Sequence, residues 1–262
     1  MAQTLRANEL LRSFSDSEQV DLFSRHTPHI TLFLAEFDLE LEGGGGGDVA
    51  KDELVQLNAT KVDSFLETIS SMNFTHIVNG LECSLSLSTR SFLEHDGDSN
   101  NDKKYYTING AYTMLNVQNT PCLKALSNAL LDKVESFVKR PVIVPSWVAS
   151  LPEPQRSAAI YRSRKYGSPN VLEGFVPHLT VGFDPSSQTA MSLESTSMKW
   201  REDAMKQWNE VFTSLVNNGC HSKVKGIAAG KNGVGGTVLA DSRLGYWSVD
   251  GNPLQVERMI VM

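Results

Sequence analysis

One short pattern occurs twice in distant parts of the chain, and it constrains the fold more than any other feature. It reads PHITL at residues 28–32 and PHLTV at residues 177–181. In both copies a histidine and a threonine alternate with apolar residues, which is the period of a β-strand with one face buried. The chain is therefore predicted to contain two equivalent strands, each with its His and Thr on one face and its apolar side chains in a core.

The segments that follow the two motifs have the same predicted order of strand, helix and two strands. The first set covers strand 29–39, helix 50–70 and strands near 74–88 and 104–118, and the second covers strand 178–183, helix 198–217 and strands near 221–230 and 236–249. Such a repeat predicts an α+β protein with a bilobal, duplicated fold. Two mainly antiparallel sheets would face a central cleft, with the helices packed outside.

The predicted organisation is a single large domain, since 262 residues with 40% hydrophobic content can bury a sizeable core. Thr120-Pro121 indicates a helix start, because Thr caps well and Pro suits the first helical position. Six of the ten prolines fall in one connection, which we expect to be irregular apart from a short helix near 155–165. The predicted segments are an arm at 1–27 (a short helix or flexible), the domain at 28–250 with first-lobe elements at 28–120, the Pro-rich insertion at 141–177 and second-lobe elements at 178–250, and a tail at 251–262.

Charge and composition narrow the classes of partner. The net charge is −6, whereas proteins that grip many phosphates of a duplex are usually basic. No apolar run is long enough for a membrane-spanning helix, so no membrane partner is expected. The three cysteines show no CxxC spacing, which argues against a disulfide framework and a zinc site. We therefore expect a monomer in a reducing compartment, the cytoplasm or alternatively the nucleus.

The paired motifs suit the chemistry of phosphodiester cleavage. An imidazole with a pKa near about 6.5 can take or give a proton at neutral pH, so His29 and His178 could serve as base and acid. The hydroxyls of Thr31 and Thr180 could bind the non-bridging phosphate oxygens and hold the phosphorus in line. This scheme needs no metal and no other cofactor.

The doubled HITL and HLTV motifs resemble those of the two-histidine phosphoesterase superfamily, which includes 2'-5' RNA ligase-like proteins and cyclic nucleotide phosphodiesterases. The duplicated layout is also similar to that family's bilobal fold, over roughly residues 28–250. The resemblance implies that His29 and His178 are the acid–base pair and that Thr31 and Thr180 are phosphate ligands. Threonine rather than serine at these positions favours the ligase and cyclic phosphodiesterase branches.

The leading prediction is hydrolysis of a 2',3'-cyclic phosphate on a nucleotide or at an RNA end. Two alternatives remain open, namely 2'-5' RNA ligation or cleavage and non-catalytic binding of RNA or a nucleotide. A basic and aromatic cluster near 156–166 could add contacts, with Tyr166 stacking on a base and Arg162 meeting a phosphate. The alternative for this cluster is an ordinary solvated helix face.

Overall fold

The computed structural model describes residues 2–14, 29–39, 51–81, 83–89, 104–109, 112–183, 196–215, 222–224, 226–231, 237–240 and 255–261. Its α-helices are α1 (Ala2–Ser13), α2 (Lys51–Ser70), α3 (Phe74–Val78), α4 (Pro121–Val134), α5 (Gln155–Tyr166) and α7 (Thr196–Leu215). Short 3₁₀ turns are η2 (Glu135–Phe137), η3 (Ser146–Ser150) and η4 (Leu172–Gly174). Both helices and antiparallel strands are present, so the predicted α+β class is confirmed.

The described strands are β1 (Leu34–Glu36), β2 (Ser84–Leu85), β3 (Tyr106–Asn109), β4 (Tyr112–Asn116), β5 (His178–Phe183), β6 (Ser222–Lys223), β7 (Gly226–Lys231), β8 (Thr237–Ala240) and β9 (Gln255–Val261). They form antiparallel sheets of order β3-β4-β5 and β1-β8-β7-β9, together with the small pair β2-β6. Each sheet therefore combines strands from both halves of the chain. The hairpin β3-β4 precedes α4, yet it pairs with the strand that carries the second motif.

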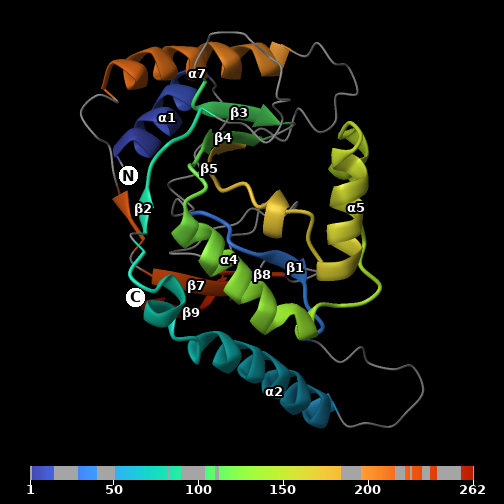
Figure 1. The fold of residues 1–262 in the computed structure, drawn as a ribbon. Coiled ribbons are helices and arrows are strands. Elements are labelled where there is room, and N and C mark those ends of the chain that lie inside the picture. Colours follow the sequence, from blue (N-terminus) through green and yellow to red (C-terminus); the bar gives the residue numbers. More distant parts are fainter. Residues whose placement is uncertain are drawn as a thin grey trace.

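Helices α1 and α7 lie side by side over the three-stranded sheet (Figure 1). Their apolar side chains meet those of Leu115 and Val181 in one core cluster, which includes Leu11 of α1 and Trp208 of α7. The Asn8 amide donates to the Val181 carbonyl at 2.8 Å and fixes α1 along β5. Close packing also requires glycine at position 182, because a Cβ there would lie 2.7 Å from Leu11 Cδ1.

A second core cluster lies between β1, α2 and α4. Its largest buried side chains include Phe33 and Phe37 beside β1, Phe65 of α2 and Leu126 of α4. Phe37 and Phe65 have ring centroids 4.8 Å apart in a tilted arrangement, which aromatic pairs favour. This cluster holds the segment that follows the first motif.

Local sequence signals explain where several elements begin and end. The Thr120 hydroxyl accepts a hydrogen bond from the backbone N–H of Leu123 at the start of α4, as its sequence predicts. The predicted helices at 50–70, 198–217 and 155–165 correspond to α2, α7 and α5. Gly167 ends α5 in the left-handed conformation, with φ of 86°, which glycine adopts without strain.

Three strand predictions need correction. Residues 74–78 form helix α3, because the Asn73 side chain caps its start and the left-handed Asn79 ends it. The predicted strand 29–39 is interrupted, with an isolated bridge at Ile30 and strand β1 only from Leu34. The predicted strand near 104–118 forms two antiparallel strands, β3 and β4, and its end also pairs with the predicted strand near 74–88 through the antiparallel bridge of Leu87 with Val117.

The two ends of the chain contribute more than the predicted arm and tail. Helix α1 is packed in a core, and β9 pairs antiparallel with β7 from Gly226 opposite Val261 to Lys231 opposite Gln255. The remaining residues of 1–27 and 251–262, and parts of the predicted strand 236–249, lie outside the described residues.

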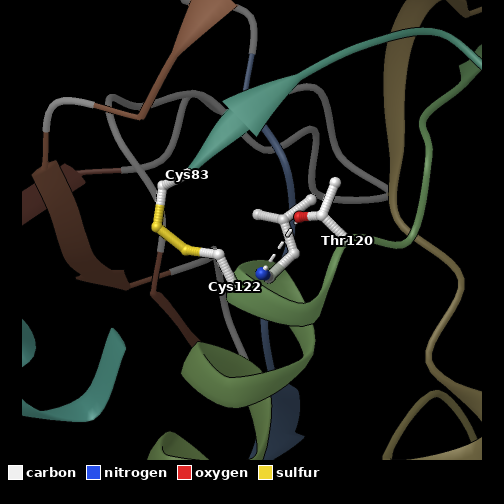
Figure 2. The surroundings of a disulfide bond; sticks show 4 residues. Cys83, Thr120 and Cys122 are labelled. Atoms are coloured by element: carbon white, nitrogen blue, oxygen red, sulfur yellow. Dashed lines mark hydrogen bonds between the residues drawn. A yellow bond between two sulfur atoms is a disulfide. The ribbon is translucent and has the colours of Figure 1, made fainter. Parts of the chain in front are cut away.

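The expectation that the cysteines form no disulfide framework needs one correction, because a single bridge is present. Cys83, between α3 and β2, is bonded to Cys122 in the first turn of α4 (Figure 2). Their Cα atoms are 5.3 Å apart, within the range that a disulfide spans. An odd number of cysteines excludes complete pairing but does not exclude one bridge, and this pairing depends on tertiary contacts between residues 39 positions apart.

Cys83→Ser together with Cys122→Ser is expected to lower the free energy of unfolding by about 2–4 kcal/mol, because the bridge restricts a long loop in the unfolded chain. Urea denaturation with and without a reductant measures this difference. The matched control is Ser86→Ala, three residues after Cys83 at a partly exposed position, which removes only a solvent-exposed hydrogen bond to Gln118. Equal midpoints for the double variant and the oxidised protein would contradict the disulfide.

Candidate functional site

The two motifs lie on neighbouring strand segments. Strand β5 is the outer strand of the three-stranded sheet, and on its outer edge Leu179 forms an antiparallel β-bridge with Ile30. In an antiparallel pair, the residue before one partner faces the residue after the other. The register therefore sets His29 opposite Thr180, and Thr31 opposite His178.

All four motif side chains share one face of this pair. Strand alternation directs His29, Thr31, His178 and Thr180 to the side opposite the paired Ile30 and Leu179. Directly opposed positions of an antiparallel pair have Cβ atoms roughly 4.5–5.5 Å apart. On this face each histidine therefore has a threonine of the other motif opposite it, so the four residues lie close together.

Burial of the motif residues follows the same alternation except at Leu179, which is only partly buried. Ile30 and Leu32 are each 4% exposed and Val181 is fully buried, so these apolar positions anchor both segments in the core. The two histidines and two threonines are only partly buried. These four residues therefore retain some solvent exposure, while helices α1 and α7 cover the other side of β4 and β5.

His178 has a fixed ring orientation. Its Nδ1 lies 3.1 Å from the Val176 carbonyl oxygen, which accepts a hydrogen bond when Nδ1 carries the proton. Nε2 then holds the free lone pair of the neutral ring. Burial lowers the pKa of His178, and the carbonyl of Val176 opposes that shift only in part. A neutral imidazole with an unprotonated Nε2 is the form that accepts a proton from water.

Strand β4 extends the motif face by one more strand. Asn116 lies opposite His178 and Met114 lies opposite Thr180 in the β4-β5 register. Asn116 is 3% exposed, and the Thr107 hydroxyl of β3 donates to its Oδ1 at 2.8 Å. Asn116 could not be found from the sequence, because its place beside His178 depends on how β4, far earlier in the chain, pairs with β5.

Arg162 and Tyr166 of α5 make contacts within their own part of the fold. Arg162 Nε donates to the Pro169 carbonyl at 2.8 Å, and desolvation lowers the pKa of its guanidinium. Tyr166 packs against the core cluster of β1, α2 and α4, and Lys165 Nζ lies 4.9 Å from its ring centroid. These contacts attach α5 to the segment that leads into β5, and a role in substrate binding stays a prediction.

The part of the chain that the structure describes contains no group of three or more His, Cys, Asp or Glu side chains placed to hold a metal ion. None of the helices within the described ranges combines the length and apolar character needed to span a bilayer. No protein-family model, curated protein or solved structure matches this chain. A functional assignment therefore depends on the residues of the site and on their geometry.

Proposed function

We propose that this protein is a metal-independent phosphodiesterase that hydrolyses the 2',3'-cyclic phosphate of a nucleotide or an RNA end. The observation that carries the proposal is the antiparallel bridge between Ile30 and Leu179. It supports an arrangement in which two imidazoles and two hydroxyls surround one phosphorus atom. This is the constellation that the resemblance to two-histidine phosphoesterases implies.

The proposed acid and base follow from the state of His178. Its neutral ring, with Nδ1 held by the Val176 carbonyl, takes a proton from the attacking water through Nε2. The water oxygen forms a bond to phosphorus as the bond from phosphorus to one ribose oxygen breaks. Protonated His29 donates its proton to that ribose oxygen, so the product is a nucleoside monophosphate and the proton count balances.

The threonines complete the proposed phosphate site. Thr31 and Thr180, on opposite segments, donate hydrogen bonds to the two non-bridging oxygens of the phosphate. These oxygens gain negative charge in the transition state, and fixed donors stabilise that charge. A positioned phosphate also keeps the attacking and departing oxygens in line.

The proposed fold is the bilobal, duplicated one that the resemblance implies. One lobe would contain the sheet β3-β4-β5 and the other the sheet β1-β8-β7-β9, with the paired motif segments at the junction. Each lobe then receives a hairpin from the half of the chain that does not supply its motif strand. We also propose a monomer with a nucleotide or RNA terminus as its substrate. The Cys83–Cys122 disulfide removes the basis for expecting a reducing compartment such as the cytoplasm or nucleus.

Purified protein is expected to hydrolyse 2',3'-cyclic nucleotides in the presence of EDTA, because two imidazoles supply all the proton transfers. Product formation by chromatography measures this activity, with a 2'-5'-linked dinucleotide as a parallel substrate. Turnover that appears only after addition of a divalent metal would contradict the mechanism. Cleavage of the dinucleotide alone would instead assign 2'-5' phosphodiester chemistry, and binding without turnover would assign a nucleotide-binding protein.

A further inference from the structure

Asn116 carries a buried hydrogen-bond donor that is unpaired within the described part of the protein. Its side chain is 3% exposed, and Nδ2 has no partner among the described residues. A buried donor without a partner is destabilising, so folded proteins rarely contain one without a reason. A ligand atom that binds at this position would supply the missing acceptor.

The amide of Asn116 is held in one orientation. The Thr107 hydroxyl, itself 6% exposed, donates to Oδ1 at 2.8 Å. Since Oδ1 is occupied by this donor, the amide directs its Nδ2–H groups elsewhere. An oriented donor of this kind needs little reorganisation when a negative group arrives.

The position of Asn116 points to the motif face. It is the Cα partner of His178 across β4 and β5, and cross-strand partners project on the same side of a sheet. His178 is in turn opposite Thr31 in the register set by the Ile30–Leu179 bridge. Asn116, His178 and Thr31 therefore form one row across three neighbouring strand segments.

The second row of this face, which contains Thr180, has an apolar residue at the position that corresponds to Asn116. Met114 occupies the position opposite Thr180, and its side chain is buried and apolar. Among the three neighbouring segments, the third polar donor therefore lies in the row of His178, while Thr107 of β3 is the cross-strand partner of Met114. The site is asymmetric, although the two motifs are nearly the same.

We infer that Asn116 is a third phosphate ligand, which donates from Nδ2 to the non-bridging oxygen nearest His178. This inference rests on the proposed function and identifies the anionic phosphate, rather than the base or sugar, as the group bound in this row. Thr107 acts as a positioning residue, because its hydroxyl donates to the amide oxygen of Asn116 and so orients the amide. A phosphate oxygen held by Asn116 and Thr31 also keeps the phosphorus close to His178 Nε2.

The test compares Asn116→Leu with the wild-type protein, using inorganic phosphate as the probe and isothermal titration calorimetry as the measurement. A lost hydrogen bond to a charged group is expected to raise the phosphate Kd roughly 10- to 100-fold. Thermal unfolding without phosphate checks that the variant is folded, because Asn116→Leu removes the acceptor of the buried Thr107 hydroxyl together with the unpaired donor. A purely structural Asn116 predicts an unchanged phosphate Kd.

A matched control comes from the same strand. Thr113 Oγ1 of β4 is also buried and unpaired among the described residues, and it lies beside Gly182 and Leu11 on the side of α1. Thr113→Val is therefore expected to leave the phosphate Kd unchanged. Asn116→Asp is the second variant, since it keeps the shape while replacing the donor by a negative charge, and it should weaken phosphate binding at least as much as Asn116→Leu.

The outcomes separate this inference from the proposed function. Equal phosphate affinity in wild type and both Asn116 variants, or no phosphate binding by wild type, would overturn the role of Asn116. In either case the hydrolysis of 2',3'-cyclic nucleotides by wild type remains a separate result. Conversely, phosphate binding that depends on Asn116 without any turnover would keep the ligand role and contradict the enzymatic proposal.

Discussion

Replacing His178 by alanine is expected to lower kcat/KM for a 2',3'-cyclic nucleotide by roughly 10²–10⁴-fold, because the attacking water then has no base. His29→Ala is expected to lower it by a similar factor through loss of the acid. Steady-state kinetics in EDTA measure both effects. The double variant should be little worse than either single variant, since residues that act in one proton-transfer step have strongly non-additive effects.

His76 offers the matched control for these substitutions. It is exposed in helix α3, away from both motifs in the sequence, and it belongs to neither strand pair. His76→Ala should keep full activity. This result would show that the loss of kcat/KM is specific to the two motif histidines. Full activity in either motif variant would contradict the acid–base assignment.

Replacing Trp208 by alanine is expected to destabilise the protein by about 3–5 kcal/mol, the usual range for a large aromatic removed from a core. Trp208 is fully buried in α7 and stacks on Phe212, with ring centroids 4.8 Å apart. Its cluster includes Leu115 and Val181, so the cavity would open beneath the strands that carry Asn116 and His178. Urea denaturation followed by circular dichroism measures the change.

The control for Trp208 is Trp147, which is 36% exposed in the turn η3. Trp147→Ala is expected to have a much smaller effect on stability, since surface substitutions usually change it by about 0.5 kcal/mol or less. If Trp208→Ala lost no more stability than Trp147→Ala, helix α7 could not pack on the sheet as described here.

The elements that local signals encode were predictable from the sequence. Thr120-Pro121 marked the start of α4, and the periodic apolar residues of α2 and α7 marked their buried faces. The strand β5 was also predicted with its bounds, because HLTVGF alternates over a short apolar run. Helix α3 was missed, although Asn73 and Asn79 provide a cap at each end.

The way in which strands combine was not predictable. Local sequence does not state that β3-β4 pairs with β5, or that β1 pairs with β8, since such pairing depends on the register between distant segments. The same limit hid the disulfide, because Cys83 and Cys122 meet only after α3 and α4 pack together.

The same distinction between local sequence and tertiary register applies to the residues of the candidate site. His29, Thr31, His178 and Thr180 were found because the motif repeats, and a repeated spacing is visible in a sequence. Asn116 belongs to no repeated pattern, and its buried amide becomes informative only beside His178 and Thr107. Tertiary register therefore adds a residue that motif analysis could not find.

The most direct test of the central claim is a crystal structure of the protein with inorganic phosphate or a nucleoside 2'-monophosphate bound. We expect one phosphate whose oxygens lie within hydrogen-bond reach, about 2.6–3.2 Å, of a ring nitrogen from each of His29 and His178. A phosphate bound elsewhere, or in contact with only one of the two imidazoles, would contradict it.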